Sequence, residues 1–211
     1  MAQNLNSVKS AASAKRASYH HGNLREALII GAEEILRERG VTGFSLREAA
    51  RRAGVSPGAP AHHFGDSRGL LTAVAARGFQ RLAEQLKSAS QRVQRDARVK
   101  AVGNAYLDFA RENGALFGIM WMRDLLDQTD CDYLATGRAA FNVLEEAALG
   151  QEVPVATAPR VPDASVIAAW AMVHGLARLT LDGALDVVPP ETQAQVMELM
   201  SVVSQPPKGP V

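Results

Sequence analysis

Apolar residues recur at the three- and four-residue spacing of an α-helix along almost the whole chain, and no stretch alternates with the period of two that marks a half-buried strand. In the first such segment, Leu24, Leu28 and Leu36 fall on one helical stripe. The pattern predicts an all-α fold of about nine helices. Their approximate ranges are residues 23–39, 46–53, 57–64, 68–90, 98–113, 115–127, 130–149, 163–184 and 190–203.

Residues that cap helices stand at the ends of several of these segments. Asn23 with Glu26, and Ser45 with Glu48, have the spacing of a capping box, in which a short polar side chain and a carboxylate satisfy free backbone N–H groups. Gly40 suits a left-handed cap after the first helix. These positions predict where the first helix ends and where the first two helices begin.

The two ends of the chain lack the helical pattern. Residues 1–18 are rich in Ala and Ser and predict a disordered, slightly basic arm. Residues 205–211 hold three prolines and predict a loose tail. Residues 151–162, also with three prolines, predict a long loop within the helical part.

The stretch from Ser45 to Phe64 has the features of a helix-turn-helix. Small residues at Ala49, Ala50 and Ala53 allow two short helices to cross closely. Gly54 suits the turn between them, because glycine tolerates a positive φ. This motif favours DNA binding, since its second helix can enter the major groove.

The second helix of this motif is predicted to start at Pro57, with Ser56 as its N-cap. Pro60 cannot donate a hydrogen bond to the Ser56 carbonyl and is expected to keep the helix short. The helix is too poor in large apolar residues to be a good element of a bundle. Its residues nearest the bases are expected to be Ser56, Gly58, Ala59 and His62.

Basic charge is concentrated toward the N-terminus, although the whole chain carries only +1. Residues 1–71 hold ten basic and six acidic side chains, whereas residues 72–211 hold thirteen and sixteen. A basic N-terminal third, with Arg47, Arg51 and Arg52 on one predicted helix, favours a phosphate-bearing partner. The alternative is an ordinary helical hairpin, since alanine-rich crossings with a glycine turn are common.

These motifs resemble the tetracycline-repressor (TetR) family of transcriptional regulators. The resemblance implies a three-helix DNA-binding domain at residues 19–68 and a helical domain for ligand binding and dimerisation at residues 69–204. The C-terminal half is similar to a subgroup with a Trp-His-Gly signature, here Trp170, His174 and Gly175. The stretches that carry the resemblance are residues 19–25, 44–56, 63–66, 70–71, 105–110, 116–117 and 170–177.

The resemblance implies that Arg47 reaches bases or phosphates. Two positions depart from the family pattern: Ala61 stands where Tyr is usual and Ser67 where Lys is usual, and both usual residues hold phosphate. The departures predict weaker DNA binding, which Arg68 and His62 are placed to compensate. The expected DNA contacts are Ser45, Arg47, Arg51, Ser56, Pro57, Gly58, Ala59, His62, His63 and Arg68.

A second candidate site consists of large apolar residues in the C-terminal domain. Pockets between helices are mostly apolar with a few polar groups, and the resemblance implies a small-molecule effector there. The alternative for any one of these residues is plain core packing, and His174 is the best polar candidate. The expected lining is Tyr106, Phe109, Phe117, Met120, Trp121, Phe141, Trp170 and His174.

The last two predicted helices, 163–184 and 190–203, are apolar on more than one side, which indicates a partner surface. In the family this pair of helices forms a two-fold bundle, so the resemblance implies a homodimer. Two-fold symmetry would present the two recognition helices to half-sites roughly 34 Å apart.

No pattern indicates an enzyme, since the sequence has no glycine-rich phosphate loop and no nucleophile elbow. His20-His21 and His62-His63 are adjacent pairs, which point about 100° apart on a helix and do not suit one metal ion. We therefore expect no cofactor and no metal. The rival function is a ligand-binding or scaffold protein of the same fold with weak or lost DNA binding. Convergence of Arg47, Arg51 and Arg68 on one basic face would distinguish the two.

The sequence also gives an expectation for location. It shows no apolar run near the roughly 18 residues of a membrane span, and no apolar signal segment at its start. A single cysteine, Cys131, fits a reducing compartment. We expect a cytoplasmic protein with no membrane partner.

Overall fold

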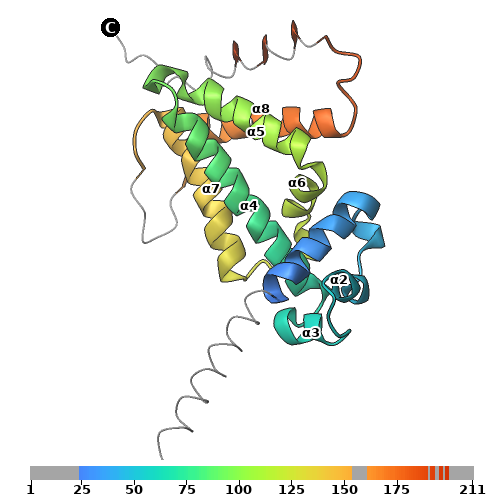
Figure 1. Cartoon of the computed structure of the whole chain (residues 1–211). Helices are drawn as coiled ribbons and strands as arrows, with labels where there is room; N and C mark the ends of the chain where they lie inside the picture. The colour runs from blue at the N-terminus through green and yellow to red at the C-terminus, as the bar shows by residue number, and fades with distance from the viewer. Residues whose placement is uncertain (1–23, 154–160, 190, 193–194, 197, 200–211) are drawn as a thin grey trace, which may run out of the picture. The chain divides into compact units, whose positions relative to one another are not determined.

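The computed structural model describes residues 24–153, 161–189 and six positions between 191 and 199, and all of its regular structure is helical (Figure 1). This confirms the predicted fold class. A helix covers residues 24–39, and three 3-10 turns follow later as η1 (Val41–Gly43), η2 (Arg95–Ala97) and η3 (Arg123–Leu125). The other helices are α2 (Leu46–Arg52), α3 (Ala59–Phe64), α4 (Ser67–Gln91), α5 (Arg98–Glu112), α6 (Gly114–Met120), α7 (Cys131–Leu149) and α8 (Ala164–Leu181).

The chain divides by compactness into two units, and the division falls inside α4. Unit 1 comprises Met1–Val74 and Met122–Asp127, and unit 2 comprises Ala75–Trp121 and Gln128–Val211. The helix-turn-helix therefore lies in unit 1, whereas α5 to α8 lie in unit 2. The predicted domain boundary between residues 68 and 69 stays a prediction.

The core of unit 1 forms where the helix of residues 24–39 meets α2. A Cβ atom on Gly31 would lie 3.2 Å from the Arg52 Cβ and 3.3 Å from the Ala49 carbonyl oxygen, so glycine allows the close approach of α2. Ala49 and Ala50 are buried at this crossing, as their small size predicts. The buried apolar residues of the first helix include Leu28, Ala32 and Ile35.

The helix caps of unit 1 agree largely with the prediction. The Glu48 backbone N–H donates to Ser45 Oγ at 3.3 Å, which confirms Ser45 as the N-cap of α2. Gly40 and Gly54 have φ angles of 65° and 67°, the left-handed values for which glycine is favoured. Asn23 lies outside the described residues.

The start of α3 differs from the prediction. The helix begins at Ala59 with Gly58 as its N-cap, two residues later than expected, and Ser56 does not cap it. The Ala59 N–H donates to the Ser56 carbonyl at 3.0 Å, which closes a turn before the helix. Pro60 is then in the first helical turn, where no N–H is needed, and the helix is short, six residues long.

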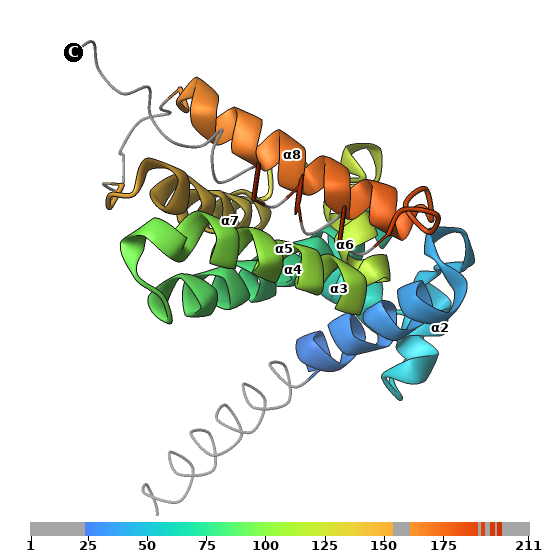
Figure 2. The same ribbon diagram turned by 90° about the horizontal axis from the view of Figure 1, so that it is seen from above.

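In unit 2, α5 is the central element and contacts α6, α7 and α8. Figure 2 shows α8 lying along α5 and α7. The contacting faces are apolar and bury, among others, Val102, Tyr106 and Phe109 of α5 and Val166 and Val173 of α8.

Two helices of unit 2 are shorter than predicted. The helix expected over 115–127 ends at Met120, because residues 122–127 leave unit 2 and bury Leu126 completely in unit 1. The helix expected over 163–184 ends at Leu181, close to Gly183 with its φ of 72°. Much of the predicted helix 190–203 lies outside the described residues.

By length and composition, α8 could cross a membrane, and it is the one described helix that meets this test. Its apolar sequence is interrupted by His174 and Arg178, so it is not a continuous apolar run. One helix of this kind is weak support for a span, and α8 packs one side on α5 and α7.

Candidate nucleic-acid interface and ligand site

The helix-turn-helix predicted from the sequence is present in unit 1. The Gly54 N–H donates to the Arg51 carbonyl (3.2 Å) and the Val55 N–H donates to the Ala50 carbonyl (3.0 Å), so the chain turns directly after α2. α2 and α3 contact each other across this turn. The arrangement leaves one side of α2 and most of the segment that enters α3 exposed.

A shallow hollow of about 360 Å³ lies beside α2 on this exposed side. Four predicted DNA contacts line it, namely Ser45, Arg47, Arg51 and Pro57. The Arg47 side chain is exposed and makes no ion pair with any described residue. Arg47 can therefore bind an external phosphate or base edge without first breaking a contact within the protein.

Arg51, in contrast, is held by a neighbour on its own helix. Its Nε donates to Glu48 Oε2 and its Nη2 donates to Glu48 Oε1, both at 2.8 Å. These hydrogen bonds lower the pKa of Glu48 to about 2, with a smaller contribution from Arg52, so the carboxylate is ionised at neutral pH. The two guanidinium N–H groups of Arg51 that could bind a phosphate are thus already bound to a carboxylate.

Arg52 has turned away from solvent, although the sequence placed it with Arg47 and Arg51. Its side chain is 12 % exposed and lies among three carboxylates. It hydrogen-bonds Glu38 at 2.9 Å and Glu48 at 3.2 Å, and it lies 3.5 Å from Glu34. The hydrogen bond with Glu38 is the main cause that raises the pKa of Arg52. Arg52 therefore joins α2 to the helix of residues 24–39.

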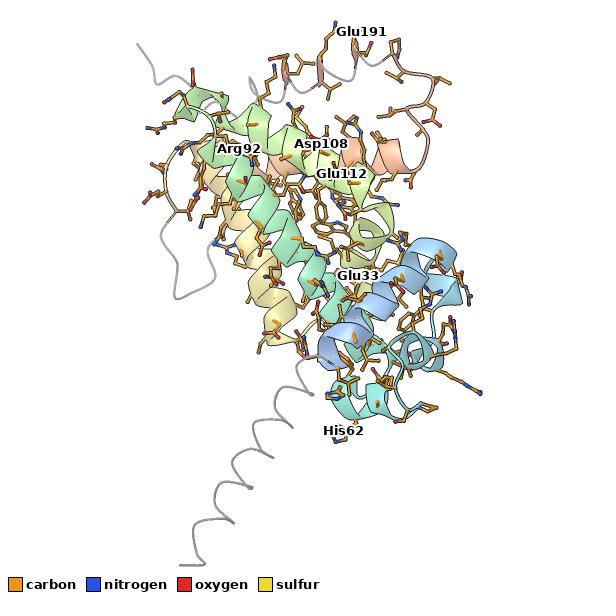
Figure 3. All side chains as sticks on the ribbon, viewed as in Figure 1. Glu33, His62, Arg92, Asp108, Glu112 and Glu191 are labelled. Atoms are coloured by element: carbon orange, nitrogen blue, oxygen red, sulfur yellow. The ribbon has the colours of Figure 1, made fainter. Side chains whose placement is uncertain are left out.

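The predicted contacts in and before α3 differ in exposure. His62 is exposed and points outward from α3 (Figure 3), whereas His63 is half-buried and packs edge-on against it, with ring centroids 5.5 Å apart. Ala59 is half-buried. The remaining predicted contacts of this segment, Ser56, Pro57 and Gly58, are exposed.

Arg68 does not line the hollow beside α2. Its guanidinium donates to the backbone carbonyls of Asp124 (3.1 Å) and Leu126 (3.3 Å), in the segment that returns to unit 1. Thr72 holds the same segment, since its Oγ1 accepts a hydrogen bond from the Asp127 N–H at 2.8 Å. Contact of Arg68 with DNA stays a prediction. In the structure Arg68 and Thr72 hydrogen-bond to the backbone of residues 124–127.

The predicted ligand residues form one cluster in unit 2, with Trp121 inside it. The Trp121 ring lies 4.6 Å from His174, 5.8 Å from Trp170 and 6.0 Å from Phe117, measured between ring centroids. Phe141 joins through Trp170 at 5.6 Å. The other predicted members, Tyr106, Phe109 and Met120, are buried.

The polar groups of this cluster are few and uncharged at neutral pH. Tyr106 Oη and His174 Nδ1 share a hydrogen bond of 2.8 Å. Burial raises the pKa of Tyr106, and a hydrogen bond with Trp170 lowers it in part. Burial, and then the positive charge of Arg178, lower the pKa of His174. That Tyr106 and His174 bind a ligand stays a prediction.

The structure adds residues that the sequence analysis did not assign to this cluster. Phe79 of α4 packs against Trp121 (5.1 Å) and Tyr133 (5.7 Å). A Cβ on Gly78 would lie 2.6 Å from Met120 Sδ, so α4 and α6 touch at this glycine. In the sequence, Phe79 is one of several apolar positions along a long helix. Its ring neighbours, Trp121 and Tyr133, lie more than forty residues away, so the pattern along the helix does not indicate them.

Among the residues that the structure describes, no group of three His, Cys, Asp or Glu side chains could hold a metal ion. His20 and His21 lie outside this part of the chain.

Comparison with known families matches both units. Residues 28–74 match the family model of bacterial regulatory proteins of the tetR family. Residues 99–203 match a model described as a tetracyclin repressor-like C-terminal domain. Together the two matches cover well over half of the chain, while the Trp-His-Gly subgroup stays a prediction.

Individual relatives agree with these matches. The chain is 30 % identical over 104 residues to the HTH-type transcriptional regulator BetI of Stenotrophomonas maltophilia (strain R551-3), covering 46 % of this chain and 50 % of that protein. It is 27 % identical over 92 residues to the uncharacterized HTH-type transcriptional regulator YobS of Bacillus subtilis (strain 168), covering 44 % and 48 %. The chain spans about half the length of these curated relatives.

One solved structure is similar over nearly the whole chain. It is a protein with unknown function from Rhodococcus sp. RHA1, 31 % identical, with a TM-score of 0.70. The similarity covers 88 % of this chain and 95 % of that one.

Proposed function

Because the chain belongs to the TetR family of bacterial regulatory proteins, we propose that it is a ligand-responsive transcriptional repressor. It binds a (pseudo)palindromic operator as a homodimer and is released by a small molecule. The family consists of regulators rather than enzymes, in agreement with the sequence prediction. A DNA partner implies a cytoplasmic location.

The exposed surface of α2 and α3 carries the proposal of DNA binding. Arg47 is free of ion pairs with the described residues and shares one hollow with Ser45 and Pro57. His62 is exposed and projects from α3 (Figure 3). Phosphate contacts from such groups give affinity, and contacts with base edges in the major groove give sequence preference.

The apolar character of α8 supports the proposal of a homodimer through residues 163–184 and 190–203. Only 28 % of the residues in this strongly apolar helix are buried. Ile167 and Leu179 are 41 % and 47 % exposed, so large apolar side chains of α8 face away from its own chain, as at a partner surface. A second copy related by a two-fold axis would cover these side chains and place two α3 helices on one duplex.

The aromatic cluster of unit 2 is proposed as the effector site, with His174 and Tyr106 as its polar groups. α4 supports a linkage between effector and DNA, because one unbroken helix contributes Ser67–Val74 to unit 1 and Ala75–Gln91 to unit 2. An effector that binds more tightly to a DNA-incompetent conformation lowers DNA affinity by that difference.

A second candidate function, a ligand-binding or scaffold protein of this fold with weak DNA binding, has specific support. Ala61 and Ser67 lack the groups that the family pattern uses on phosphate. Arg51 and Arg68 are both engaged within unit 1. Arg47 and Arg51 line one hollow, but Arg68 does not.

Fluorescence anisotropy separates the two functions. Purified protein is titrated with its own upstream intergenic duplex and with a scrambled duplex, at two salt concentrations. We expect tighter binding to the native duplex with a steep loss at high salt, as counterion release requires. Arg47→Ala should weaken binding at least about fivefold, or roughly 1 kcal/mol.

Absence of binding to both duplexes would be followed by selection from a randomised DNA pool. Failure to enrich any sequence there would favour the scaffold. Enrichment of a palindrome would restore the repressor proposal and supply the operator.

A further inference from the structure

The indole N–H of Trp121 is buried in unit 2 and has no hydrogen-bond acceptor among the described residues. Neighbouring polar groups are paired: Tyr106 Oη with His174 Nδ1 at 2.8 Å, and Tyr133 Oη donating to the Met120 carbonyl at 3.2 Å. A buried donor without an acceptor destabilises the fold, because it has lost its hydrogen bond to water. The protein therefore keeps a strong unused donor within its proposed effector site.

Aromatic rings from three helices surround this donor. Phe79 of α4 and Phe117 of α6 lie 5.1 Å and 6.0 Å from the Trp121 ring, and Trp170 and His174 of α8 lie 5.8 Å and 4.6 Å from it. The interplanar angles run from 42° to 86°, so several rings present an edge. A planar aromatic ligand can replace contacts between these rings with equivalent contacts of its own, because rings favour offset and edge-to-face neighbours.

The charges near the cluster argue against an ionic ligand. Arg178 adds a positive charge near His174, and Arg138 lies over the Phe141 ring at 5.6 Å. The buried carboxylate of Glu145 is paired with Arg138 at 3.9 Å, and no carboxylate contacts the Trp121 ring among the described interactions. A cation would therefore meet repulsion and no unpaired counter-ion among these groups. An anion would leave water for a neutral N–H donor, which does not replace its hydration.

From this arrangement we propose that the effector is an uncharged planar aromatic molecule with a hydrogen-bond acceptor, such as a carbonyl oxygen or a ring nitrogen, that accepts from Trp121 Nε1. The proposal rests on the proposed effector site. It adds the chemical class of the ligand and the residue that selects it. A site with a buried unpaired donor discriminates against ligands that lack the acceptor.

Quinoline and naphthalene test this, because they have nearly the same shape and differ in one ring nitrogen. Their dissociation constants are measured by equilibrium dialysis, read by ultraviolet absorbance, without DNA. The ratio of the two constants carries the test, since it cancels most of the packing contribution. Trp121→Phe keeps a ring and removes the N–H, and Tyr133→Phe is the matched control that removes a hydroxyl already paired to the backbone.

We expect Trp121→Phe to weaken quinoline about tenfold relative to naphthalene, the effect of one hydrogen bond of roughly 1.4 kcal/mol. Tyr133→Phe should leave the ratio within about twofold. Circular dichroism of each variant confirms that it is folded.

An unchanged ratio in Trp121→Phe would overturn the proposal, as would tighter binding of phenyltrimethylammonium or benzoate than of quinoline. Failure of the wild-type chain to bind quinoline up to millimolar concentration would also overturn it. Any of these results leaves the DNA-binding proposal untouched, because the anisotropy titration needs no ligand. Release of the operator by a compound of another class would keep the ligand response and reject only the class.

Discussion

Glu48 and Arg51 are joined by two parallel hydrogen bonds of 2.8 Å, one turn apart on α2. The same carboxylate also accepts from Arg52 at 3.2 Å. Glu48 thus neutralises a cation that lines the hollow of the proposed DNA interface. A bidentate pair of this kind is the geometry that arginine also uses on phosphate, so the two partners compete for one guanidinium.

The first prediction is that Glu48→Gln strengthens DNA binding. Loss of the carboxylate charge frees Arg51 for a phosphate, which should raise affinity for any duplex about two- to tenfold at low salt. One further phosphate contact should steepen the slope of log K against log salt by about 0.9. Anisotropy titrations over four salt concentrations measure both quantities.

Glu38→Gln is the matched control for this variant. This variant removes the same charge, but the Glu38 carboxylate pairs with Arg52 rather than with Arg51. Its salt slope should stay that of the wild-type chain. The double variant Glu48→Gln, Arg51→Ala should lose the gain, and equal slopes in Glu48→Gln and Glu38→Gln would show that only net charge matters.

Local signals in the sequence account for the parts of unit 1 that were predicted correctly. Ser45 caps α2 because its side chain and the Glu48 N–H are only three residues apart, and Gly54 turns the chain because of its own backbone preference. Ala49 and Ala50 are buried because a close helix crossing admits small side chains. Such features depend on a few neighbouring residues.

The features that the sequence did not predict depend on distant partners. Arg52 is turned inward by Glu34 and Glu38 of another helix. α6 ends at Met120, and the segment after it belongs to unit 1 with Leu126 buried, which no periodicity along α6 reveals. The aromatic cluster was predicted from residue type and family resemblance, but its ring contacts join four separate helices, α5 to α8.

The second prediction concerns the turn of the helix-turn-helix. Gly54→Ala places a Cβ on a residue with a φ of 67° and should destabilise the fold by about 1–2 kcal/mol, measured by urea unfolding. Gly58→Ala is the matched control, since Gly58 has a φ of −83° and open space around its Cβ position. It should be neutral or stabilise by less than about 1 kcal/mol. Equal losses in both would mean that the positive φ is not what constrains position 54.

The third prediction tests the proposed dimer. Leu179→Glu puts a charge on the exposed apolar side of α8 and should shift the chain toward monomer, seen by sedimentation velocity, with operator binding weakened at least about tenfold. Leu134→Glu on α7 is the control, because Leu134 is similarly exposed (52 % against 47 %) but lies outside the proposed interface. A Leu179→Glu variant that remains dimeric would contradict the assignment of α8.

His174 gives unit 2 a pH dependence with a definite sign. Burial disfavours its charged form, and Arg178 adds repulsion, so its pKa in the folded protein lies below the ordinary value near 6.5. The unfolded chain therefore takes up the proton first as the pH falls. Stability is unaffected above the unfolded pKa and is lost as the pH drops from there through the folded pKa.

The fourth prediction is that wild-type protein loses more stability between pH 8 and pH 5 than His174→Gln does, measured by urea unfolding at each pH. Glutamine can still hydrogen-bond to Tyr106 but cannot take up a proton, so this component of the loss disappears. Arg178→Gln should reduce the loss in part, because it removes the second cause of the lowered pKa and keeps burial, the first. Identical losses in wild type and His174→Gln would show that His174 is protonated equally easily in the folded and unfolded chains.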